Sequence, residues 1–589
     1  MIFGSNLPPY RRHDRCDLLF LYPFLGLRRI SNMLMSNLYT GNTGLVTSQN
    51  ALNTTAHNLS NINTEGYTRQ QVSQGDCAYQ TLSKNYKIVA WKQIGRGVTY
   101  NNCKQVRSFF LDQQYRLEAG RNSFYDVSVK TLEEVEDQLQ ELNGTEFADS
   151  LNNLWVSVQE MAKDPTNATN QNTFVTRANE FLTRAQSVYQ GLIDYQENMD
   201  QQVAELVEQI NTYGDRIREL NEDIVEIESG NQEHANDLRD ERNLLLDKLG
   251  ELGNIDYYED VWGNVLVSFE GTQFVTTDHV NHMGVDTTLV SSVGFATPYW
   301  EFAAKHGYDE LGNRVVLDIS GAKVFDLTLP VSTQMNTDVG KLRATMLARG
   351  DHYATYHDIT DDSTGSYYSK NISQSVIMNV EAEFDQLVNN IITTINSVLE
   401  QAPSNPANYT NKEDDSVLPS FYDLFVMSAP EDTLKYDIDD NHKAGENPTG
   451  FTIRNTMIND YYLQTPTLLE YRLEDGSEDT ETMNNLKAAF TNSIYTLNPN
   501  TATTTDFLGY YNMLVSQVAT SGSVYNSISE SQQQTVDTIA SAREEIHGVS
   551  SDEELQFMIQ FQNAFNASSR YINVVSEMLE HLVTSLGHS

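Results

Sequence analysis

Residues that could catalyse a reaction or hold a phosphate occur in this chain without the spacing that such chemistry needs. A nucleophilic serine, a zinc-bound histidine pair and a phosphate loop each have a fixed motif, and none of the three is present. Gly340-Lys341 resembles the end of a phosphate loop, but Leu342 stands where the magnesium-binding Ser or Thr is required. We therefore expect no catalytic residues and no enzyme activity.

Candidate metal ligands are equally dispersed. Asp437, Asp439 and Asn441 are spaced like the first ligands of a calcium loop, but His442 replaces the glycine that the loop's sharp turn needs. The three cysteines lack paired metal-ligand spacing, and an odd number favours buried thiols over a disulfide framework. The 12 histidines are scattered, and we expect His57 to be a packing or surface residue. No metal and no cofactor is expected.

Charge restricts the partners of this chain. Its 589 residues carry 81 acidic and 38 basic side chains, a formal net charge of -43. A surface this negative repels nucleic-acid phosphates and anionic lipid, so neither nucleic acid nor membrane is an expected partner. The alternative interpretation is that the acidic composition is unrelated to any specific partner. Hydrophobic residues make up 39% of the chain, which predicts folded domains with a sizeable core.

Residues 1–32 differ from the rest of the chain. Arginines flank an apolar run, Leu18–Leu27, which is shorter than the roughly 20 residues needed to cross a bilayer. Because two arginines follow this run and no small-residue cleavage site is present, the segment does not resemble a secretory signal. Arg28-Arg29 could be encoded by a ribosome-binding sequence, so we expect translation to start at Met33. The alternative is a genuine N-terminal extension.

Both ends of the chain carry narrow apolar stripes at helical spacing. Near the start, the stripe consists of Leu45, Leu52, Leu59 and Ile62. Near the end, Leu555 flanks a seven-residue ladder of Met558, Phe565, Ile572, Leu579 and Leu586. A lone helix with so narrow a stripe gains little by folding. We expect the two terminal helices to pair with each other or with neighbouring copies; packing on the monomer's own core is the alternative.

Between the ends, the hydrophobic period changes from helix to strand and back. Residues 200–229 alternate apolar positions by three and four, which predicts a rod of roughly 45 Å, and residues 375–399 repeat that pattern. Residues 255–335 alternate with a period of two between glycines, which predicts β structure. Residues 401–500 are rich in Pro, Asp, Asn and Thr, and we expect them to be irregular with short strands. The predicted fold is mainly α with a β-rich insertion.

A motif follows the first terminal stripe. Residues 56–70 read Ala-His-Asn-Leu-Ser-Asn-Ile-Asn-Thr-Glu-Gly-Tyr-Thr-Arg-Gln. Asn-rich sequence predicts a helix end near residues 61–63, and a glycine then permits a turn that releases the chain. The residues that define the motif are Asn58, Asn61, Gly66, Tyr67 and Arg69.

A second motif begins the last helical segment. Residues 548–554 read Gly-Val-Ser-Ser-Asp-Glu-Glu, and residues 560–567 read Gln-Phe-Gln-Asn-Ala-Phe-Asn-Ala. Ser551 and Asp552 fit a helix N-cap, and the acidic run suits the positive end of the helix dipole. The residues that define this motif are Gly548, Asp552, Glu553, Glu554, Phe561 and Gln562.

These two motifs resemble the N- and C-terminal signatures of flagellar rod, hook and hook-associated proteins. The first departs from the usual form by having Glu65 where proline is common and Leu59-Ser60 where Ile-Ala is common. Residues 237–249, Asp-Leu-Arg-Asp-Glu-Arg-Asn-Leu-Leu-Leu-Asp-Lys-Leu, are similar to a segment of the hook-associated protein 1 family, the hook–filament junction proteins. The resemblance covers nearly all of residues 33–589 and is weak in residues 256–335 and 400–500.

The resemblance implies a structural subunit of the bacterial flagellum that forms a ring between hook and filament. It implies paired N- and C-terminal helices, a long helical-bundle rod domain and a solvent-facing β domain. The implied partners are further copies of the chain, hook protein, a second junction protein, a flagellar export chaperone and the type III export apparatus. Such a chain would be exported unfolded from the cytoplasm and would act outside the cell. Its terminal helices would drive self-assembly.

The expected domains follow from the resemblance and the changes of period. They are residues 1–32 as a mis-assigned extension; 33–75 with 548–589 as the terminal helical domain; 76–254 with 340–400 and 501–547 as the rod; 255–339 as the β-rich insertion; and 401–500 as an irregular or β insertion. The alternative functions are another flagellar axial protein, hook or cap, or a secreted coiled-coil adhesin. An enzyme carried on the β insertion is a further alternative that no motif supports.

Overall fold

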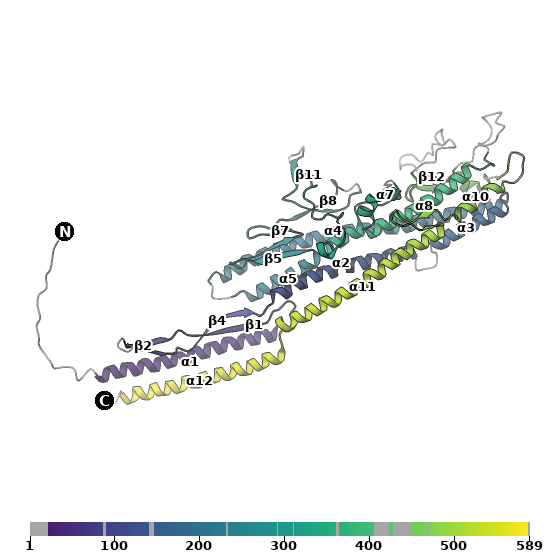
Figure 1. The fold of residues 1–589 in the computed structure, drawn as a ribbon. Helices are drawn as coiled ribbons and strands as arrows, with labels where there is room; N and C mark the ends of the chain where they lie inside the picture. Colours follow the sequence, from purple (N-terminus) through teal and green to yellow (C-terminus); the bar gives the residue numbers. More distant parts are fainter. Residues whose placement is uncertain are drawn as a thin grey trace. The chain divides into compact units, whose positions relative to one another are not determined.

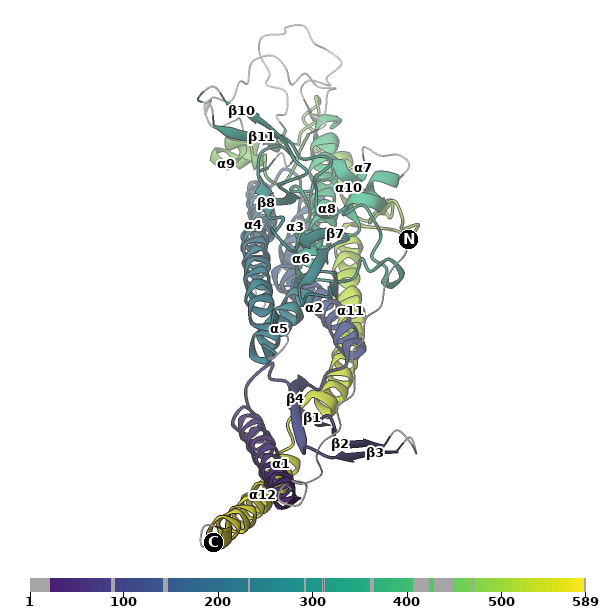
Figure 2. The ribbon, with the colours of Figure 1, turned by 90° about the vertical axis from the view of Figure 1, so that its left-hand side faces the viewer.

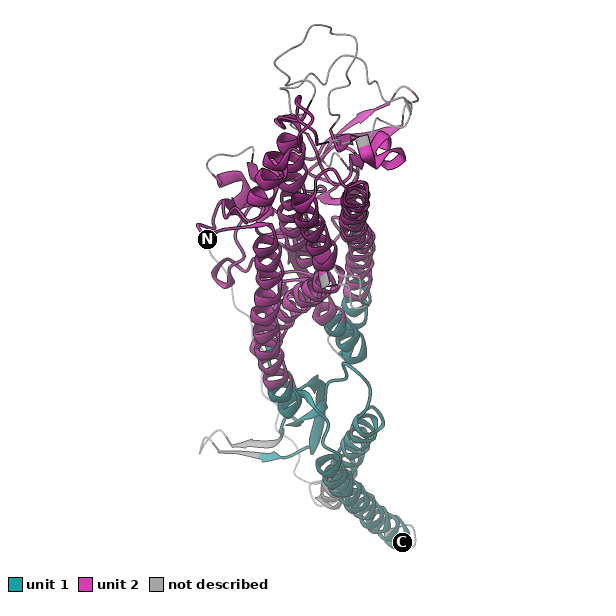
Figure 3. Ribbon diagram, turned by 90° about the vertical axis from the view of Figure 1, so that its right-hand side faces the viewer, with its two compact units in different colours: residues 1–109, 222–244, 541–589 teal, residues 110–221, 245–540 magenta. Residues whose placement is uncertain are grey.

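The contacts of the chain define two compact units (Figure 3). The computed structural model describes residues 22–85, 90–140, 147–230, 234–290, 293–309, 311, 313–360, 365–405, 423–427, 450–468 and 471–586. Unit 1 comprises residues 1–109, 222–244 and 541–589, and unit 2 comprises residues 110–221 and 245–540. Among the described helices, α2 (Phe109–Gln140), at its first residue, α4 (Ala168–Glu228), α5 (Asn236–Leu252) and α11 (Phe507–His547) continue from one unit into the other.

Unit 1 contains the two terminal helices side by side (Figure 1). Its elements are α1 (Tyr22–Ser60), β1 (Gln70–Asp76), β2 (Gln80–Asn85), β3 (Ala90–Ile94), β4 (Val98–Gln105) and α12 (Ser551–Leu586). β1 and β4 form an antiparallel ribbon, with Val72 opposite Cys103, and this ribbon packs on α1. β2 and β3 form a second antiparallel pair. The paired terminal helices expected from the sequence are confirmed.

Unit 2 is a bundle of long helices (Figure 2). Besides its parts of α4, α5 and α11, its helices are α2 (Phe109–Gln140), α3 (Phe147–Lys163), α6 (Lys341–Arg349), α7 (His357–Thr360), α8 (Val376–Glu400), α9 (Asp460–Gln464) and α10 (Thr480–Phe490). The core gathers around α8, where Phe384 lies 4.8 Å from Phe147 between ring centroids. Ser375 caps α8 by accepting a hydrogen bond from the Met378 N–H.

The strands of unit 2 make small antiparallel sheets. They are β5 (Ile255–Glu259), β6 (Val265–Phe269), β7 (Thr272–Val275), β8 (Met283–Asp286), β9 (Thr297–Trp300), β10 (Lys305–Tyr308), β11 (Arg314–Asp318), β12 (Phe425–Met427), β13 (Thr456–Ile458), β14 (Tyr495–Thr496) and β15 (Thr504–Thr505). In the β5-β6-β7 sheet, Val265, Val267 and Phe269 of β6 point inward at alternate positions. Mainly α structure with a β-rich insertion is therefore confirmed.

The structure differs from the sequence-based expectations in two places. Residues 401–500, expected to be irregular with short strands, contain the short strands β12, β13 and β14. They also contain the unexpected helix α10, whose buried Met483, Leu486 and Phe490 pack on α3 and α8. Helix α12 begins one residue after Ser550, so Ser550 holds the cap position expected for Ser551. The β1–β4 ribbon packs on α1 and belongs to unit 1. The domain boundaries expected from the sequence stay a prediction.

Candidate functional site

The chain that leaves α1 turns back on the last helical turn, and Asn58 holds that turn together. Its side chain is 1% exposed. Its Oδ1 accepts hydrogen bonds from the Tyr67 hydroxyl at 2.7 Å and from the Gln70 N–H at 3.0 Å. Its Nδ2 donates to the Gln70 carbonyl oxygen at 2.9 Å. An amide is suited to this position because it donates and accepts at once.

Gly66 makes the turn possible for two reasons. Its φ is +78°, in the left-handed region that side chains other than glycine rarely adopt. A Cβ at this position would also lie 3.2 Å from Cβ of Leu244 at the end of the unit 1 segment of α5. Asn61 supports the same turn, because its Nδ2 donates to the His57 carbonyl and its Oδ1 accepts from the Thr64 hydroxyl. Every named residue of the first motif thus takes part in one turn or its continuation.

The first turn of α12 meets this turn through Glu554. The Glu554 residue is 2% exposed, and its Oε2 accepts from Asn58 Nδ2 at 3.2 Å. Its Oε1 accepts from Arg69 Nε at 3.0 Å, while Arg69 Nη1 lies 3.0 Å from Glu553 Oε2. The Arg69 guanidinium also lies over the ring of Phe557, 5.6 Å from its centroid. The two motifs, separated by nearly five hundred residues, therefore form one ion-paired junction, which we call the clasp.

His547, the last residue of α11 before the connection to α12, also contacts the clasp. The His547 carbonyl accepts from the Arg69 N–H at 2.8 Å. The His547 ring Nε2 accepts from the Ser108 N–H at 2.8 Å, which requires that nitrogen to be unprotonated. Gly548 follows directly, and a Cβ there would overlap the Glu544 carbonyl oxygen. His547 was not anticipated from the sequence, because nothing local marks a histidine that serves as an acceptor for a distant N–H.

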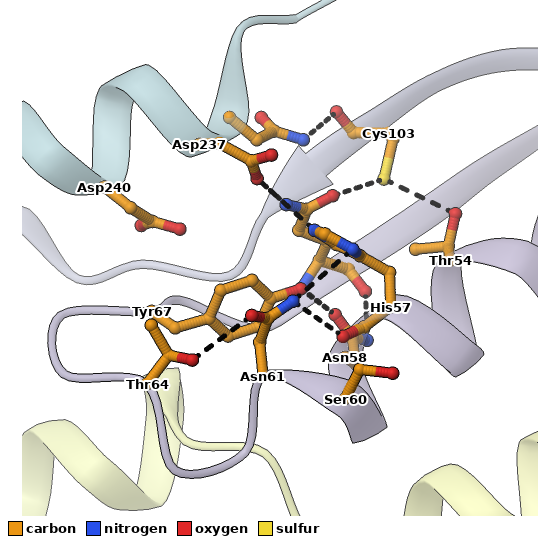
Figure 4. Close-up of polar contacts among 12 residues, drawn as sticks. Thr54, His57, Asn58, Ser60, Asn61, Thr64, Tyr67, Cys103, Asp237 and Asp240 are labelled. Carbon is orange, nitrogen blue, oxygen red and sulfur yellow. Dashed lines mark hydrogen bonds and ion pairs between the residues drawn. The ribbon is translucent and has the colours of Figure 1, made fainter.

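The start of α5 completes the site (Figure 4). Asp240 Oδ2 accepts from the Thr68 N–H at 3.1 Å, and its Oδ1 accepts from Gln105 Nε2 at 2.8 Å. Burial raises the pKa of Asp240 to about 6, and this outweighs the hydrogen bonds from Thr68 that lower it. Asp237 Oδ1 accepts from Gln70 Nε2 at 3.1 Å and lies 3.4 Å from His57 Nε2. These aspartates belong to the segment 237–249 that carried the family resemblance, although no site role was assigned to them.

The most buried residues of α1 are not those of the predicted leucine stripe. Leu45, Leu52 and Leu59 are half-buried on the flank of α1, and Ile62 lies beyond the helix end, 39% exposed. The buried positions are small or polar: Gly41, Thr47, Ser48, Ala51, Thr55 and Asn58. A Cβ at Gly41 would lie 2.7 Å from Ile572 Cγ1, so the two helices approach closely here. We call this row of small side chains the α1 seam.

The predicted ladder of α12 faces α1 only in part. Met558, Phe565, Ile572 and Leu579 are half-buried, Val575 is the most enclosed apolar side chain of the helix, and Leu555 is 45% exposed. The Leu586 side chain lies outside the described residues. Phe561 stacks on Phe557 with 6.1 Å between centroids, whereas Asp552 and Gln562 are exposed. The assembly role of these residues stays a prediction.

The chemistry of the clasp is that of binding and positioning. Its groups are carboxylates, amides, a guanidinium and backbone N–H groups, joined to one another by hydrogen bonds and ion pairs. Across the described ranges, no three His, Cys, Asp or Glu side chains converge in a way that could hold a metal ion. Among the helices of those same ranges, none combines enough length and apolarity to span a bilayer.

Sequence comparison finds similarity to flagellar proteins along the chain. The family described as "Flagellar hook-associated protein FlgK helical domain" matches residues 132–307. "Flagella basal body rod protein" matches residues 38–68, and "Flagellar basal body rod FlgEFG protein C-terminal" matches residues 540–585, so the two halves of the clasp fall in or beside these segments.

Relatives and a solved structure resemble the whole chain or part of it. Flagellar hook-associated protein 1 of Bacillus subtilis is 26% identical over 552 residues, which cover 93% of this chain and 98% of the relative. Flagellar hook-associated protein 1 of Salmonella typhimurium is 24% identical over 214 residues, covering 36% of this chain and 37% of the relative. The structure of the flagellar hook junction protein FlgK from Burkholderia pseudomallei has a TM-score of 0.50 at 12% identity, covering 74% of this chain and all of that one, and it supports the fold alone.

Proposed function

The chain belongs to the flagellar hook-associated protein 1 family, and on that premise we propose that it is a structural subunit of the bacterial flagellum at the junction between hook and filament. In this role it self-assembles into a ring through its terminal helices after export in an unfolded state. The alternatives, a hook protein, a cap protein or a secreted adhesin, are not favoured, because the Bacillus subtilis junction-family relative is matched over 98% of its length.

The observation that carries this proposal is the clasp. Glu554 and Arg69 form an ion pair between the two ends of the chain, with the Glu554 side chain 3% exposed. Each of the two terminal helices is therefore placed relative to the other by specific contacts at one end and by the α1 seam along its length. A subunit that must enter an axial structure needs both of its ends in a defined register.

The terminal helices leave apolar side chains uncovered, which supports self-assembly as their use. On α12, Tyr571, Val574 and Met578 are 42%, 47% and 56% exposed, and they lie on one face at helical spacing. On α1, Tyr39 and Val46 are each 45% exposed. An apolar surface of this kind on a helix pair marks a protein contact, and copies of the same chain are the partners that a ring requires.

The further partners follow from the same role. Hook protein on one side, a second junction protein on the other, an export chaperone and the type III export apparatus would each contact the chain at a different stage. The location is the hook–filament junction outside the cell, after a transient cytoplasmic stage. The role is structural, and we propose that the chain has no enzyme activity.

Electron microscopy of a deletion strain tests the proposal. The strain is expected to form hooks without filaments and to lose flagellin to the medium, and the intact gene is expected to restore filaments. Complementation with Val574→Asp is expected to fail, because the new charge lies on the exposed face of α12 while the buried seam stays intact. The matched control is Ala204→Asp, which adds the same charge at an exposed position of α4 in unit 2 and should restore filaments.

Two results would overturn the proposal in different ways. Normal filaments in the deletion strain would exclude the junction role altogether. Full rescue by Val574→Asp would leave the junction role standing and would show that this face of α12 does not contact neighbouring copies.

A further inference from the structure

Three acidic residues of α8 are buried at alternate positions without a basic partner. Glu381, Glu383 and Asp385 are each 0% exposed in the core of unit 2. Within the described part of the chain, none of the three forms an ion pair with Lys, Arg or His. A buried carboxylate without a countercharge is costly to keep ionised, because burial removes the water that stabilises the charge.

Two of these carboxyl groups hold backbone segments that lie far from α8 in sequence. Glu381 Oε2 accepts from the Ala354 N–H at 2.9 Å, while its Oε1 is enclosed and has no hydrogen-bond partner. Asp385 accepts from the Tyr356 N–H at 3.0 Å and from the Ile453 N–H at 2.7 Å. The segments around residues 354 and 453 are therefore anchored to α8 through carboxyl groups that have no basic partner.

The third carboxyl group is surrounded by neutral donors. Glu383 accepts from the Tyr368 hydroxyl at 3.1 Å, from Asn498 Nδ2 at 2.8 Å and from Gln517 Nε2 at 3.0 Å. These donors satisfy its oxygens, but none of them carries a positive charge. Glu383 thus links α8 to α11 and to the segment that precedes it without forming a salt bridge.

The nearest charged groups are already engaged elsewhere. His352 lies between Asp351, at 2.7 Å from Nδ1, and Asp358, at 3.2 Å from Nε2, so two carboxylates compensate its charge. The Arg454 guanidinium lies over the ring of Tyr353 at 5.0 Å, and the His357 ring packs against Tyr356 at 4.1 Å. His352 and Arg454 favour the ionised form of Glu381, and His357 favours that of Asp385, but Asp358 opposes the latter.

Burial outweighs these charges at all three sites. It raises the pKa of Glu381 to about 8, that of Glu383 to about 7 and that of Asp385 to about 6. Each value lies above that of an exposed carboxyl group, so at mildly acidic pH the folded state holds protons that the unfolded chain has already lost. The backbone and side-chain hydrogen bonds described above act in the opposite direction, because they favour the ionised form.

We propose that unit 2 takes up protons at Glu381, Glu383 and Asp385 when it folds, so that its stability is set by the pH of its surroundings. Because the pKa of each group is raised in the folded state, the stabilisation is complete at acidic pH. It is lost progressively as the pH rises from about 4, where the carboxyl groups of the unfolded chain ionise, to the folded-state pKa values of about 6 to about 8. Unit 2 is accordingly easier to unfold in a slightly alkaline compartment than in an acidic one. This inference does not depend on the proposed flagellar role.

Urea unfolding of the full-length chain tests the proposal, with tryptophan fluorescence as the probe. Trp155, Trp262 and Trp300 all lie in unit 2. The decisive variant is Glu381→Gln, which keeps an acceptor for the Ala354 N–H but cannot ionise. The ratio of its folding constant to that of the wild type should rise by about tenfold per pH unit between about pH 5 and about pH 8. The matched control is Glu208→Gln on the exposed face of α4, whose ratio should not change with pH.

The outcome that overturns the proposal is a Glu381→Gln ratio that stays as constant with pH as that of the control. If Glu381→Gln does not fold, infrared spectroscopy of the folded Glu270→Gln variant decides the question, because this change removes a further buried carboxyl group of unit 2 whose pKa burial raises to about 7. A band from protonated carboxyl groups should be present near neutral pH and should disappear above about pH 9. Absence of this band at neutral pH would show that the buried groups are ionised and would equally overturn the proposal.

Discussion

Helix α8 and helix α1 are both buried along one stripe, yet they bury opposite kinds of side chain. On α8, the stripe includes Phe384, Ile391 and Ile395, each 0% exposed. On α1, the buried seam is built from Gly, Ser, Thr and Ala, while the leucines lie on the flank. Unit 2 thus encloses its large apolar residues, whereas the terminal pair leaves many of its own partly exposed. The difference indicates that unit 2 is stabilised by its own apolar core. The paired helices α1 and α12 depend in addition on the clasp and on contacts with other molecules.

The physical basis is the amount of apolar surface removed from water. Burying apolar surface stabilises by about 25 cal/mol per Å². A large aromatic or branched side chain contributes several times the area of an alanine or a serine. Small side chains allow close approach of the helices and good dispersion contacts, but they bury little apolar area. The α1 seam therefore contributes little stabilisation from apolar burial. The clasp at Asn58, Arg69 and Glu554 adds stabilisation, as do the proposed contacts with neighbouring copies.

The largest effect is expected for Phe384→Ala in the core of unit 2. The ring lies 4.8 Å from that of Phe147 and 6.4 Å from that of Tyr511, so truncation leaves a cavity. We expect the free energy of unfolding of unit 2 to fall by about 3–5 kcal/mol, measured by urea denaturation. Phe302→Ala is the matched control, because that ring is 59% exposed and its loss should change little. Equal effects of the two changes would contradict the enclosed core.

An intermediate effect is expected for Arg69→Ala in the clasp. The change leaves Glu554, 2% exposed, without its guanidinium partner. We expect local opening of the clasp to become easier by about 2 kcal/mol, with the pairing of α1 and α12 weakened. The measurement is hydrogen exchange of the Gln70 amide, whose N–H donates to Asn58.

The clasp prediction has its own control. Arg570→Ala removes an exposed arginine from α12 and should leave the exchange of the Gln70 amide unchanged. Unchanged exchange in Arg69→Ala as well would mean that the ion pair does not hold the two motifs together. In that case the α1 seam alone would have to place the terminal helices.

The smallest effects on stability are expected for alanine substitutions at two helical glycines, Gly41 and Gly522. Alanine favours a helix over glycine by about 1 kcal/mol. At Gly41, a Cβ would lie 2.7 Å from Ile572 Cγ1, and we expect overpacking to exceed this gain, for a net loss of about 1 kcal/mol. At Gly522 of α11, the nearest atom is 4.0 Å away, so Gly522→Ala should stabilise by about 0.5–1 kcal/mol. Thermal unfolding of the two variants should therefore show shifts of opposite sign, and stabilisation by Gly41→Ala would show that the α1 seam is loosely packed.

The long helices could be predicted because their periodicity is local. In α4, seven of the eight positions expected at three-and-four spacing are buried or half-buried, and Ile227, at the end of the helix, is 47% exposed. The α8 stripe is buried throughout except for the half-buried Val398. Helix α10 was missed because its three core residues lie in a region rich in turn-forming residues. Packing on α3 and α8, together with the Asp479 N-cap, stabilises it.

The clasp could be predicted only in part. The residues of both motifs were identified, and Gly66 was assigned to a turn, because a glycine after a helix that ends in Asn is a local signal. That Arg69 meets Glu554 was not predictable, since no local feature pairs charges nearly five hundred residues apart. Asp240 and His547 were missed for the same reason: their partners, Thr68 and Ser108, lie in other segments of the chain.

The sequence by itself determined where the long helices and the β-rich insertion form, that the two ends carry family motifs, and which family they resemble. Hydrophobic period, turn residues and caps act over a few neighbouring positions, so they can be read from one segment at a time. Only the tertiary structure decided that α1 buries its small residues more fully than its leucines, that the motifs meet in one ion-paired clasp, and that three carboxyl groups of α8 are enclosed without a countercharge. Those outcomes depend on which surfaces meet, and a helix's own periodicity does not specify its partner.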